Sequence, residues 1–480
     1  MASTNSIHSS KGRPRRVHIL GGGLAGLSCG ADLVRTGHPV TVLEAQPNVG
    51  GLAQSFEFQG FTCDLGPHRF HSNSKAIVDH MFDACQGKVH TRDRLSRIFR
   101  FGKFIDYPLK AGNVIRSLPF HLLALSMLDY WWMRLRLKFS PLPDDSFKNY
   151  VRKRFGNTLY DLFFGTYTEK AWMIPASQIS PDWAGQRITL LNLWDVVKKT
   201  LFRPKNVPRT LVSLFYYPEH GGAGAISKGY QRIIEQSGSR VLTCAPVKRI
   251  LTDGQRIKEL VYEHDGKEVT EAADFVVSTI PVSRLVEGIE PRCPDEVLQA
   301  ARDLKHKAII FVYLILRRAQ VTPDHWVYLP EPALLVHRIS EFKNFSHNSA
   351  PADRTALCAE ITCNENDDRW RMSDEQLRDA SVKDLTGIGL FKAEEVEGFT
   401  VRRVPYAYPL YDLPYRQNLQ VLLQYLRRFQ NLMSTGRQGL FRYGNMDHSI
   451  GMGTRVARTL ATGEGPDHGE VGADLKENID

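Results

Sequence analysis

The chain has 480 residues, and its 42% hydrophobic and 24% charged content is that of a folded protein large enough for two or three lobes. A formal net charge of +10 fits an anionic small molecule, a nucleic acid or an acidic membrane surface; we favour a phosphate-bearing small molecule and expect no nucleic-acid partner. No apolar run approaches the ~18 to 20 residues that span a bilayer, so we expect no transmembrane segment.

The two ends of the chain and its cysteines indicate a cytoplasmic protein. Residues 1–14 are polar and basic and lack the apolar core of a secretory signal, so they are predicted to form a disordered arm. Residues 466–480 are polar and acidic and are predicted to form a disordered tail. The seven cysteines are scattered without the spacing of a metal site, so we expect reduced thiols and no metal.

The first sixty residues read as strand, glycine turn, helix and strand. In RRVHILGGGLAGLSCGADLVRTGHPVTVLEAQ, residues 17–20 are predicted to form a short apolar strand and residues 39–43 a second one, with a helix between them. Three glycines with the spacing G-x-G-x-x-G separate the first strand from the helix. An acidic residue ends the second strand, about twenty positions later. The order of these parts predicts a dinucleotide site.

Each residue of this motif has a mechanical role in holding a pyrophosphate. Gly21 lets the chain turn, Gly23 lets the backbone approach the phosphates, and Gly26 lets the helix pack against the strand. The free N–H groups at the start of the helix face the phosphates, and Glu44 accepts hydrogen bonds from a ribose. A glycine-rich structural turn is the alternative interpretation.

A second glycine pair identifies the dinucleotide. Gly50 and Gly51, followed by LAQSFEFQGFTCDLG, resemble the second glycine signature of the large FAD-dependent family that includes amine oxidases, protoporphyrinogen oxidases and phytoene desaturases. In that family the Gly-Gly turn lies against the ribose and pyrophosphate of FAD. The resemblance implies FAD as the cofactor.

The stretch GPHRFHSNSK, which begins at Gly66, resembles UDP-galactopyranose mutases of the same superfamily. By that resemblance Gly66 contacts the cofactor, and His68 lies near flavin N5, where it orients flavin and substrate and shuttles a proton. A metal site would need a further ligand at suitable spacing, which the sequence does not offer. A structural turn with solvated histidines is the remaining alternative.

Two further segments resemble the phosphate-binding parts of the mutases. In HRISEFKNF the resemblance implies that Arg338 contacts the substrate diphosphate and acts in catalysis. In the tyrosine-rich VPYAYPLYDLPY it implies that Tyr408 and Tyr411 bind the same phosphates. Both residue types suit a diphosphate. Arginine is permanently charged and donates hydrogen bonds to two oxygens at once, and the tyrosine hydroxyl donates a hydrogen bond without adding charge. A packed strand edge is the alternative for the tyrosines.

The segment GRQGLFRYGNMDHSIGMG resembles the closing motif of the family. The resemblance implies that Arg437, Met446 and Asp447 contact FAD and that Tyr443 contacts the substrate. Earlier in the chain, VLTCAPVKRI resembles the segment whose backbone, around Val247, receives the adenine. The chain departs from the mutases at residues 215–217, where FYY replaces a second phosphate-binding arginine, and this puts UDP-galactose itself in doubt.

The overall pattern predicts an α/β fold with three parts. DFVVSTIP, at 274–281, is predicted to be a buried strand of a parallel sheet, and HKAIIFVYLIL, at 306–316, gives the longest strand signal. The predicted parts are a discontinuous Rossmann-like FAD-binding domain of residues 15–85, 218–290 and 418–465, a mainly antiparallel substrate-binding domain of residues 86–109 and 295–417, and a helical lobe of residues 110–210.

The most apolar helical stretch is LPFHLLALSMLDYWWMRLRL, at 118–137. His121, Asp129 and Arg134 interrupt it, so it is too polar to cross a bilayer. We predict a core helix of the helical lobe. The alternative is a helix that lies on a membrane surface through its two adjacent tryptophans.

The resemblance leaves three functions open. The first is a mutase-like enzyme that interconverts pyranose and furanose rings of a nucleotide-diphosphate sugar through reduced flavin N5. The second is an oxidoreductase of the amine oxidase or protoporphyrinogen oxidase type, which transfers hydride from its substrate to flavin. The third is a flavin-binding partner protein without turnover. All three predict bound FAD, and the first two predict an open cavity beside it.

Overall fold

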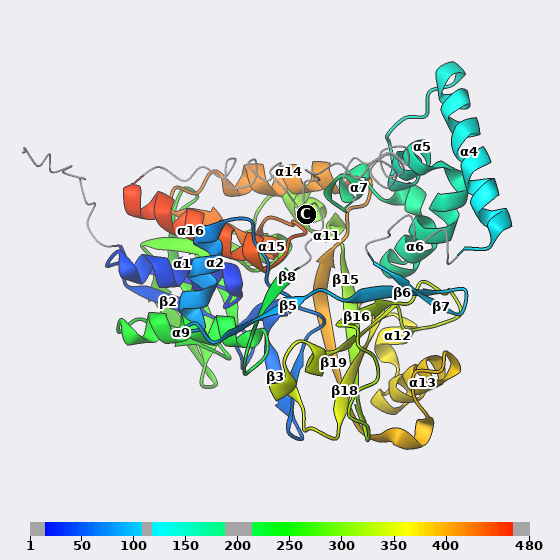
Figure 1. Cartoon of the computed structure of the whole chain (residues 1–480). Helices are drawn as coiled ribbons and strands as arrows, with labels where there is room; N and C mark the ends of the chain where they lie inside the picture. The colour runs from blue at the N-terminus through cyan, green and yellow to red at the C-terminus, as the bar shows by residue number, and fades with distance from the viewer. Residues whose placement is uncertain (1–14, 108–117, 188–213, 464–480) are drawn as a thin grey trace, which may run out of the picture.

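The computed structural model of this chain describes residues 15–107, 118–187 and 214–463 (Figure 1). The predicted arm at 1–14 and tail at 466–480 lie outside the described residues, as do parts of the predicted helical lobe. In the described part the chain forms two large sheets, a smaller sheet and a group of helices.

A five-stranded parallel sheet forms the Rossmann-like part. Its strand order is β20-β13-β1-β2-β9, and every neighbouring pair is parallel. The strands β1, β2 and β13 are rich in valine and isoleucine and are buried along their whole length, as both faces of a parallel sheet require. The strands are β1 (Val17–Leu20), β2 (Val40–Leu43), β9 (Arg240–Leu242), β13 (Phe275–Ser278) and β20 (Leu432–Ser434). The predicted α/β class with a split Rossmann-like sheet is confirmed.

Four helices pack around this sheet: α1 (Leu24–Arg35), α2 (Lys75–Ala84), α9 (Gly224–Gln236) and α16 (Met446–Thr462). Helix α1 contacts both α9 and α16. Its approach to α16 is close, because a Cβ atom on Gly453 would lie 2.1 Å from the carbonyl oxygen of Ala25. Gly26 serves the same purpose within the βα turn, since its Cβ would lie 2.2 Å from the carbonyl oxygen of Gly21.

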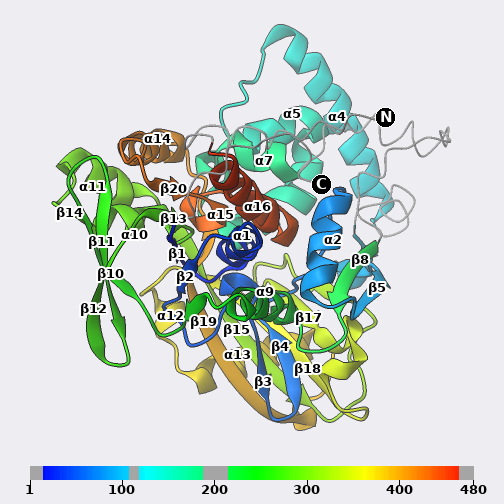
Figure 2. The ribbon, with the colours of Figure 1, turned by 90° about the vertical axis from the view of Figure 1, so that its left-hand side faces the viewer.

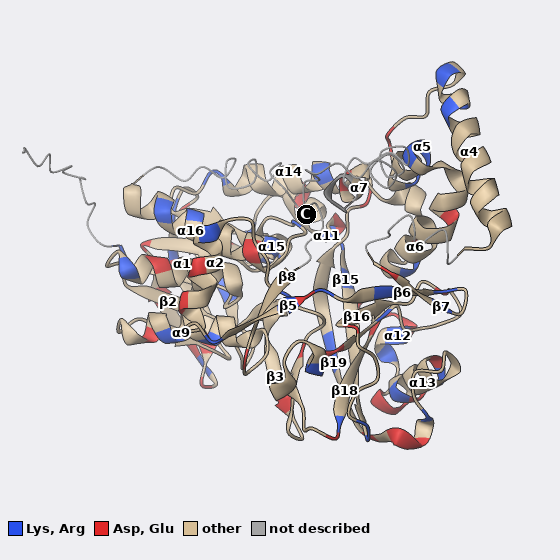
Figure 3. Ribbon diagram, viewed as in Figure 1, with Lys and Arg blue, Asp and Glu red and all other residues tan. Residues whose placement is uncertain are grey.

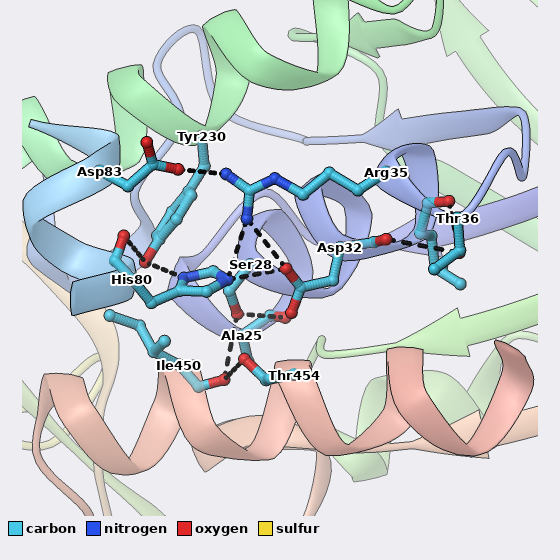
Figure 4. A network of polar contacts seen from close by, with 11 residues as sticks. Ala25, Ser28, Asp32, Arg35, Thr36, His80, Asp83, Tyr230, Ile450 and Thr454 are labelled. Carbon is cyan, nitrogen blue, oxygen red and sulfur yellow. Dashed lines mark hydrogen bonds and ion pairs between the residues drawn. The ribbon is translucent and has the colours of Figure 1, made fainter. Parts of the chain in front are cut away.

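A polar network fixes α2 against α1 and α9 (Figure 4). His80 of α2 contacts the Asp32 carboxylate of α1 through Nε2 at 2.8 Å and the Tyr230 hydroxyl of α9 through Nδ1 at 2.8 Å. Arg35 bridges Asp32 and Asp83 from the other side. Because α2 directly follows the histidine-containing turn of residues 66–74, this network also fixes the position of that turn.

A smaller sheet and three helices lie at the edge of the Rossmann-like part (Figure 2). The strands have the order β12-β11-β10-β14. They are β10 (Val247–Thr252), β11 (Ile257–His264), β12 (Lys267–Ala272) and β14 (Ile289–Glu290). The helices α10 (Val282–Glu287), α11 (Asp295–Asp303) and α14 (Tyr415–Leu426) share a buried apolar cluster with this sheet.

The second large sheet has seven strands in the order β19-β15-β18-β17-β16-β6-β7. All its pairs are antiparallel except β16 with β6. Strand β15 has the predicted bounds, but β19 is longer, with 14 residues against 11. The strands are β6 (Ser96–Arg100), β7 (Lys103–Asp106), β15 (His306–Leu316), β16 (Trp326–Tyr328), β17 (Arg338–Glu341), β18 (Thr355–Cys363) and β19 (Val396–Pro409).

Shorter elements complete the body of the molecule. Helices α12 (Asp368–Arg371) and α13 (Asp374–Gly387) lie beside the seven-stranded sheet (Figure 1). Two strand pairs, β3 with β4 and β5 with β8, connect the large parts. Their bounds are β3 (Ser55–Phe58), β4 (Phe61–Asp64), β5 (Val89–Asp93) and β8 (Leu214–Pro218). Helix α15 (Gly436–Gly439) precedes α16.

The helical lobe contains α4 (Phe120–Phe139), α5 (Phe147–Leu159), a π-helical turn (Tyr160–Gly165), α6 (Thr166–Trp172) and α7 (Pro181–Arg187). Helix α4 lies at the outside of the lobe and projects beyond the rest of the body (Figure 1). The prediction of a core helix at 118–137 is therefore wrong: only three residues of α4 are buried, and among the described elements its main packing partner is α5. None of the helices in the described residues combines the length and the apolar character needed to cross a membrane.

Candidate active site

A cavity of about 980 Å³ opens between the carboxyl ends of the parallel strands and the seven-stranded sheet. Crevices at the carboxyl ends of parallel strands, between two parts of a fold, are where α/β proteins bind their ligands. The structure brings most of the predicted site residues to its wall. Those that line it are Gly21, Gly23, Glu44, Gly50, Gly51, His68, Val247, Arg338, Tyr408, Arg437, Tyr443 and Met446.

The glycine turn forms one end of this cavity and leaves room for a dinucleotide. A Cβ atom added to Gly23 would meet nothing within 4 Å, although this residue caps helix α1 at its N-terminus. Glu44 accepts the N–H of Gly22 at 2.7 Å and the N–H of Gln46 at 2.8 Å, which fixes its carboxylate at the end of β2. Open space before a helix N-terminus, with a fixed carboxylate beside it, fits the phosphates and ribose of FAD.

Two predicted glycines act on the backbone behind the cavity wall and are not among its lining residues. Gly26 allows the close approach of α1 to β1 described above. Gly66 has a φ of +93°, and a Cβ there would lie 3.1 Å from the ring of Phe311. Only glycine adopts this conformation without strain, so Gly66 shapes the turn that presents His68.

His68 lies in the cavity wall as a neutral side chain. Its Nδ1 atom is buried without a hydrogen-bond partner among the described residues, which fits a site that receives a polar ligand. Burial, together with the charges of Arg437 and Arg338, lowers the pKa of His68 to about 4. So low a pKa does not suit the proton shuttle that the resemblance implies, which would titrate near neutrality. Within the described residues, no three His, Cys, Asp or Glu side chains form a metal-binding group.

Arg338 extends from β17 and is held by a buried carboxylate on β18. Its Nε donates to Oε1 of Glu360 at 2.7 Å, and its Nη2 donates to Oε2 at 2.6 Å and to the Tyr408 hydroxyl at 3.3 Å. Burial alone would lower the pKa of Arg338, but the charge of Glu360 raises it well above its usual value. The two N–H groups on Nη1 are therefore the ones that could reach a ligand oxygen.

Arg437 lies against two stacked tyrosine rings at the cavity wall. Its guanidinium carbon is 4.9 Å from the centroid of the Tyr408 ring and 4.6 Å from that of Tyr443, and the two rings stack at 5.6 Å. The same guanidinium donates to the carbonyl oxygens of Ala407 at 2.6 Å and Gly444 at 3.2 Å. These contacts fix the position of the Arg437 guanidinium at the cavity wall.

The structure does not bring Tyr411 and Asp447 to the cavity wall among the residues that it describes. Tyr411 is buried, stacks on Tyr415 at 4.3 Å, and its hydroxyl accepts the N–H of Tyr443 at 2.8 Å. It therefore supports the cavity wall from behind. Asp447 lies in the first turn of α16, 3.3 Å from Nδ1 of His448, whereas its neighbour Met446 lines the cavity.

Sequence analysis assigned no role to a cluster of basic and aromatic residues that also lines the cavity. The guanidinium carbon of Arg94 lies 5.2 Å from the Trp326 ring and 5.1 Å from the Tyr107 ring, and that of Arg69 lies 5.6 Å from Trp326. Tyr107 in turn contacts Tyr328 edge to face at 5.2 Å. Their signal in the sequence is weak, because single Arg and Tyr residues on strand edges are common.

Glu360 was also missed, and here a usable signal exists. It is the one acidic residue in the apolar strand TALCAEITC, and its side chain is fully buried. A buried carboxylate needs a partner, so an acid inside such a strand indicates a buried ion pair.

The charge of the cavity wall is strongly unbalanced. Among its lining residues in the described part of the chain, Glu44 is the only carboxylate. The lining arginines are Arg69, Arg94, Arg284, Arg338, Arg402, Arg403 and Arg437. Three of them, Arg284, Arg338 and Arg403, form ion pairs with Glu287, Glu360 and Asp374, which do not line the cavity. The lining still carries more arginines than all these carboxylates together, so it attracts anions and disfavours protonated amines.

Comparisons with known proteins agree with this fold. The chain is 26% identical over 304 residues to all-trans-retinol 13,14-reductase of Danio rerio, and 25% identical over 285 residues to a zeta-carotene-forming phytoene desaturase of Myxococcus xanthus. These matches cover 57% and 55% of this chain and 49% and 53% of the relatives, so the chain spans about half the length of the curated relatives it matches.

Solved structures match over nearly the whole chain. Reduced UDP-galactopyranose mutase superposes with a TM-score of 0.82 at 20% identity, covering 96% of this chain and 97% of the mutase. A putative protoporphyrinogen oxidase from Exiguobacterium sp. 255-15 has a TM-score of 0.70 at 19% identity, covering 94% of this chain and 99% of that one. At these identities the likeness establishes the fold.

A family model described as flavin-containing amine oxidoreductase matches residues 24–465. This range includes nearly the whole cavity wall, from the helix that follows the glycine turn to α16. The open cradle at Gly23 and the buried Nδ1 of His68 both fit the cofactor of that family. The chain therefore belongs to the family of flavin-containing amine oxidoreductases, and its cofactor is FAD.

Proposed function

We propose that this protein is a mutase-like enzyme that binds a nucleotide-diphosphate sugar and interconverts its pyranose and furanose rings. The observation that carries the proposal is the lining of the cavity, with seven arginines and one carboxylate. A diphosphate brings the negative charge that such a wall favours, whereas a protonated amine would be repelled. The likeness to a reduced UDP-galactopyranose mutase supports the same interpretation at the level of fold.

The side chains assign distinct roles around a diphosphate. Arg338 would contact the phosphates through Nη1, because Glu360 and Tyr408 hold its Nε and Nη2. Its charge would stabilise the diphosphate as a leaving group. Preorganisation by Glu360 means that the guanidinium loses little freedom when the ligand binds.

Tyr408 and Tyr443 would complete the phosphate contacts, since both line the cavity, stack on each other and contact the Arg437 guanidinium. His68 would orient the ligand as a neutral imidazole, because its pKa of about 4 leaves it uncharged at neutral pH. A neutral imidazole can donate or accept a hydrogen bond without adding to the positive charge of the wall.

Bound FAD supplies a nucleophilic N5 when it is reduced and a hydride acceptor when it is oxidised. Both chemistries need the substrate held against the flavin face while water is kept out. The buried rings of Trp326 and Phe311 line the cavity and would exclude water from that side.

The second candidate is an FAD-dependent oxidoreductase that takes hydride from its substrate. Its support is the set of sequence relatives, which includes a retinol reductase and a carotene-forming desaturase. The cavity also has an apolar wall, formed by Ile309, Phe311 and Val404, that could hold an uncharged substrate.

One experiment separates the two candidates. The FAD-loaded protein, oxidised or reduced with dithionite, is incubated with UDP, dTDP and GDP sugars, and the sugar ring forms are quantified while the flavin spectrum is followed. We expect ring interconversion with the reduced protein alone and no reoxidation of flavin. Bleaching of the oxidised flavin by a substrate, reversed by air, would select the oxidoreductase. The mutase proposal would be refuted if the protein neither bound nor turned over any of these nucleotide sugars.

A further inference from the structure

Helix α4 presents a largely apolar face to solvent, interrupted by the exposed His121 and Lys138. The most exposed side chains on it are Phe120 at 84%, Phe139 at 83%, Leu128 at 70% and Trp132 at 64%. The other large apolar side chains exposed on this helix are Leu125, Met127, Trp131 and Leu135. Elsewhere in the described residues, exposed apolar side chains of this size are scattered singly, so α4 stands out.

Helical geometry places all of these side chains on one side of α4. At 3.6 residues per turn, the eight positions fall within an arc of about 160° around the helix axis. The buried residues Ser126, Tyr130 and Met133 lie on the opposite side. The helix is therefore largely apolar on both sides: Tyr130 and Met133 face the protein, and the arc of eight side chains faces solvent.

The inner side of α4 is fixed to α5, so this orientation is built into the fold. The Asp129 carboxylate accepts a hydrogen bond from the Asn157 side chain at 2.8 Å and from the N–H of Thr158 at 2.6 Å. Gly156 has a φ of +84°, and a Cβ there would lie 2.9 Å from Asp129. These contacts prevent the helix from rolling its apolar face inward.

The charges of α4 have a clear asymmetry (Figure 3). Asp129 is the only acidic residue of the helix, and its carboxylate faces α5. Arg134, Arg136 and Lys138 are all exposed near the C-terminal end. By the same helical geometry, the two arginines lie close to the two edges of the apolar arc and Lys138 lies within it. An apolar face with aromatic residues and basic edges matches an anionic lipid surface, where the arc enters the acyl boundary and the basic groups meet the headgroups.

We propose that α4 docks this protein onto the surface of an anionic bilayer. The helix would lie in the plane of the interface, with Leu128, Trp132 and Phe139 inserted and the arginines at headgroup level. The net charge of +10 supports this occupant, because it attracts anionic lipid and repels a second copy of the chain. The inference does not depend on the reaction proposed above.

Membrane docking would act on the same packed lobe that borders the cavity. Tyr167, in α6 of the helical lobe, contacts the cavity residue Tyr328 edge to face at 5.3 Å. A bilayer seated on α4 would therefore hold the enzyme through the lobe that supports one wall of its cavity.

Vesicle flotation of the full-length, FAD-loaded protein tests the proposal. The vesicles are pure phosphatidylcholine or phosphatidylcholine mixed with phosphatidylglycerol. The apolar variant is Leu128→Gln/Trp132→Gln/Phe139→Gln, and the matched control, Phe101→Gln/Leu214→Gln/Leu413→Gln, changes three exposed apolar residues outside α4. Retained FAD absorbance and circular dichroism establish that each variant is folded.

We expect wild type and the control variant to float with the anionic vesicles, and the apolar variant to partition at least tenfold less. A basic variant, Arg134→Gln/Arg136→Gln/Lys138→Gln, should lose its preference for anionic over neutral vesicles, and salt should weaken wild-type binding. Wild type that stays unbound, or an apolar variant that floats like wild type, would overturn the proposal. So would a wild-type dimer by light scattering that the apolar variant converts to monomer without any vesicle binding.

Discussion

Replacing Arg338 with methionine asks whether this guanidinium binds substrate or only neutralises Glu360. The Glu360 side chain is fully buried, and the two hydrogen bonds from Arg338 are short, at 2.7 and 2.6 Å. Removing the arginine alone leaves a buried carboxylate without its counter-charge, which costs about 3–5 kcal/mol of unfolding free energy. Lost activity in Arg338→Met would therefore have two possible causes.

The double variant Arg338→Met/Glu360→Leu separates these causes. Two apolar side chains of similar volume replace the ion pair, and such replacements are neutral or stabilising in other buried pairs. We expect urea denaturation to give a loss of about 3–5 kcal/mol for Arg338→Met and a return to within about 1 kcal/mol of wild type for the double variant. The control Arg378→Met removes an exposed ion pair with Asp379 and should change stability by less than about 0.5 kcal/mol.

Ligand binding by the double variant decides the role of Arg338. A charge-assisted hydrogen bond to a phosphate contributes about 1.5–3 kcal/mol, which corresponds to roughly a tenfold to hundredfold change in Kd. We expect calorimetric titration of the FAD-loaded protein with UDP to show a loss of this size in both Arg338 variants. If the double variant is stable and binds UDP as tightly as wild type, Arg338 has a structural role alone and the proposed diphosphate site is wrong.

Two further predictions concern the cofactor cradle and the effect of acid. Gly23→Ala should leave the stability of the FAD-free protein within about 0.5–1 kcal/mol of wild type yet reduce bound FAD, because the added Cβ meets only the open space where the cofactor would lie. Gly26→Ala should instead unfold the βα turn, because its Cβ clashes with the carbonyl oxygen of Gly21. Equal FAD content in Gly23→Ala and wild type would contradict the proposed cofactor cradle. Burial of His306 lowers its pKa from 6.5 to about 4, so the unfolded chain binds its proton first as the pH falls. The stability of wild type relative to His306→Asn should therefore fall by up to about 3 kcal/mol between pH 7 and pH 4, measured by urea denaturation, and a constant difference would refute the shifted pKa.

The parallel sheet and its glycine turn could be predicted because their signals are local. A strand, three glycines, a helix and a second strand follow one another within thirty residues, and each position has a steric reason that does not depend on distant parts of the chain. The strand at 275–278 could be predicted because its buried run has the composition of a central strand, but its pairing with β1, 258 residues away, could not.

The arrangement of the cavity depends on contacts that sequence spacing does not reveal. Arg338 was identified by resemblance, but its partner Glu360 comes from the neighbouring strand through the register of β17 with β18. The alternating side-chain directions of a strand do not predict where Tyr408 and Tyr411 point, because β19 ends at Pro409 and the chain turns there. As a result Tyr408 lines the cavity while Tyr411, three residues later, packs behind it.

Helix α4 shows why apolar spacing alone gives the wrong environment. Its sequence predicts an apolar core helix, and the structure contains a helix there, but apolar content alone cannot say which side the rest of the protein covers. The deciding residue is Asp129, which would be an unfavourable choice for a core helix unless its carboxylate found donors. Those donors are Asn157 and the Thr158 backbone on α5, beside a left-handed glycine that makes room for the carboxylate. Asp129 thus faces the protein together with the buried Tyr130 and Met133, and the exposed apolar residues are left for a partner outside it.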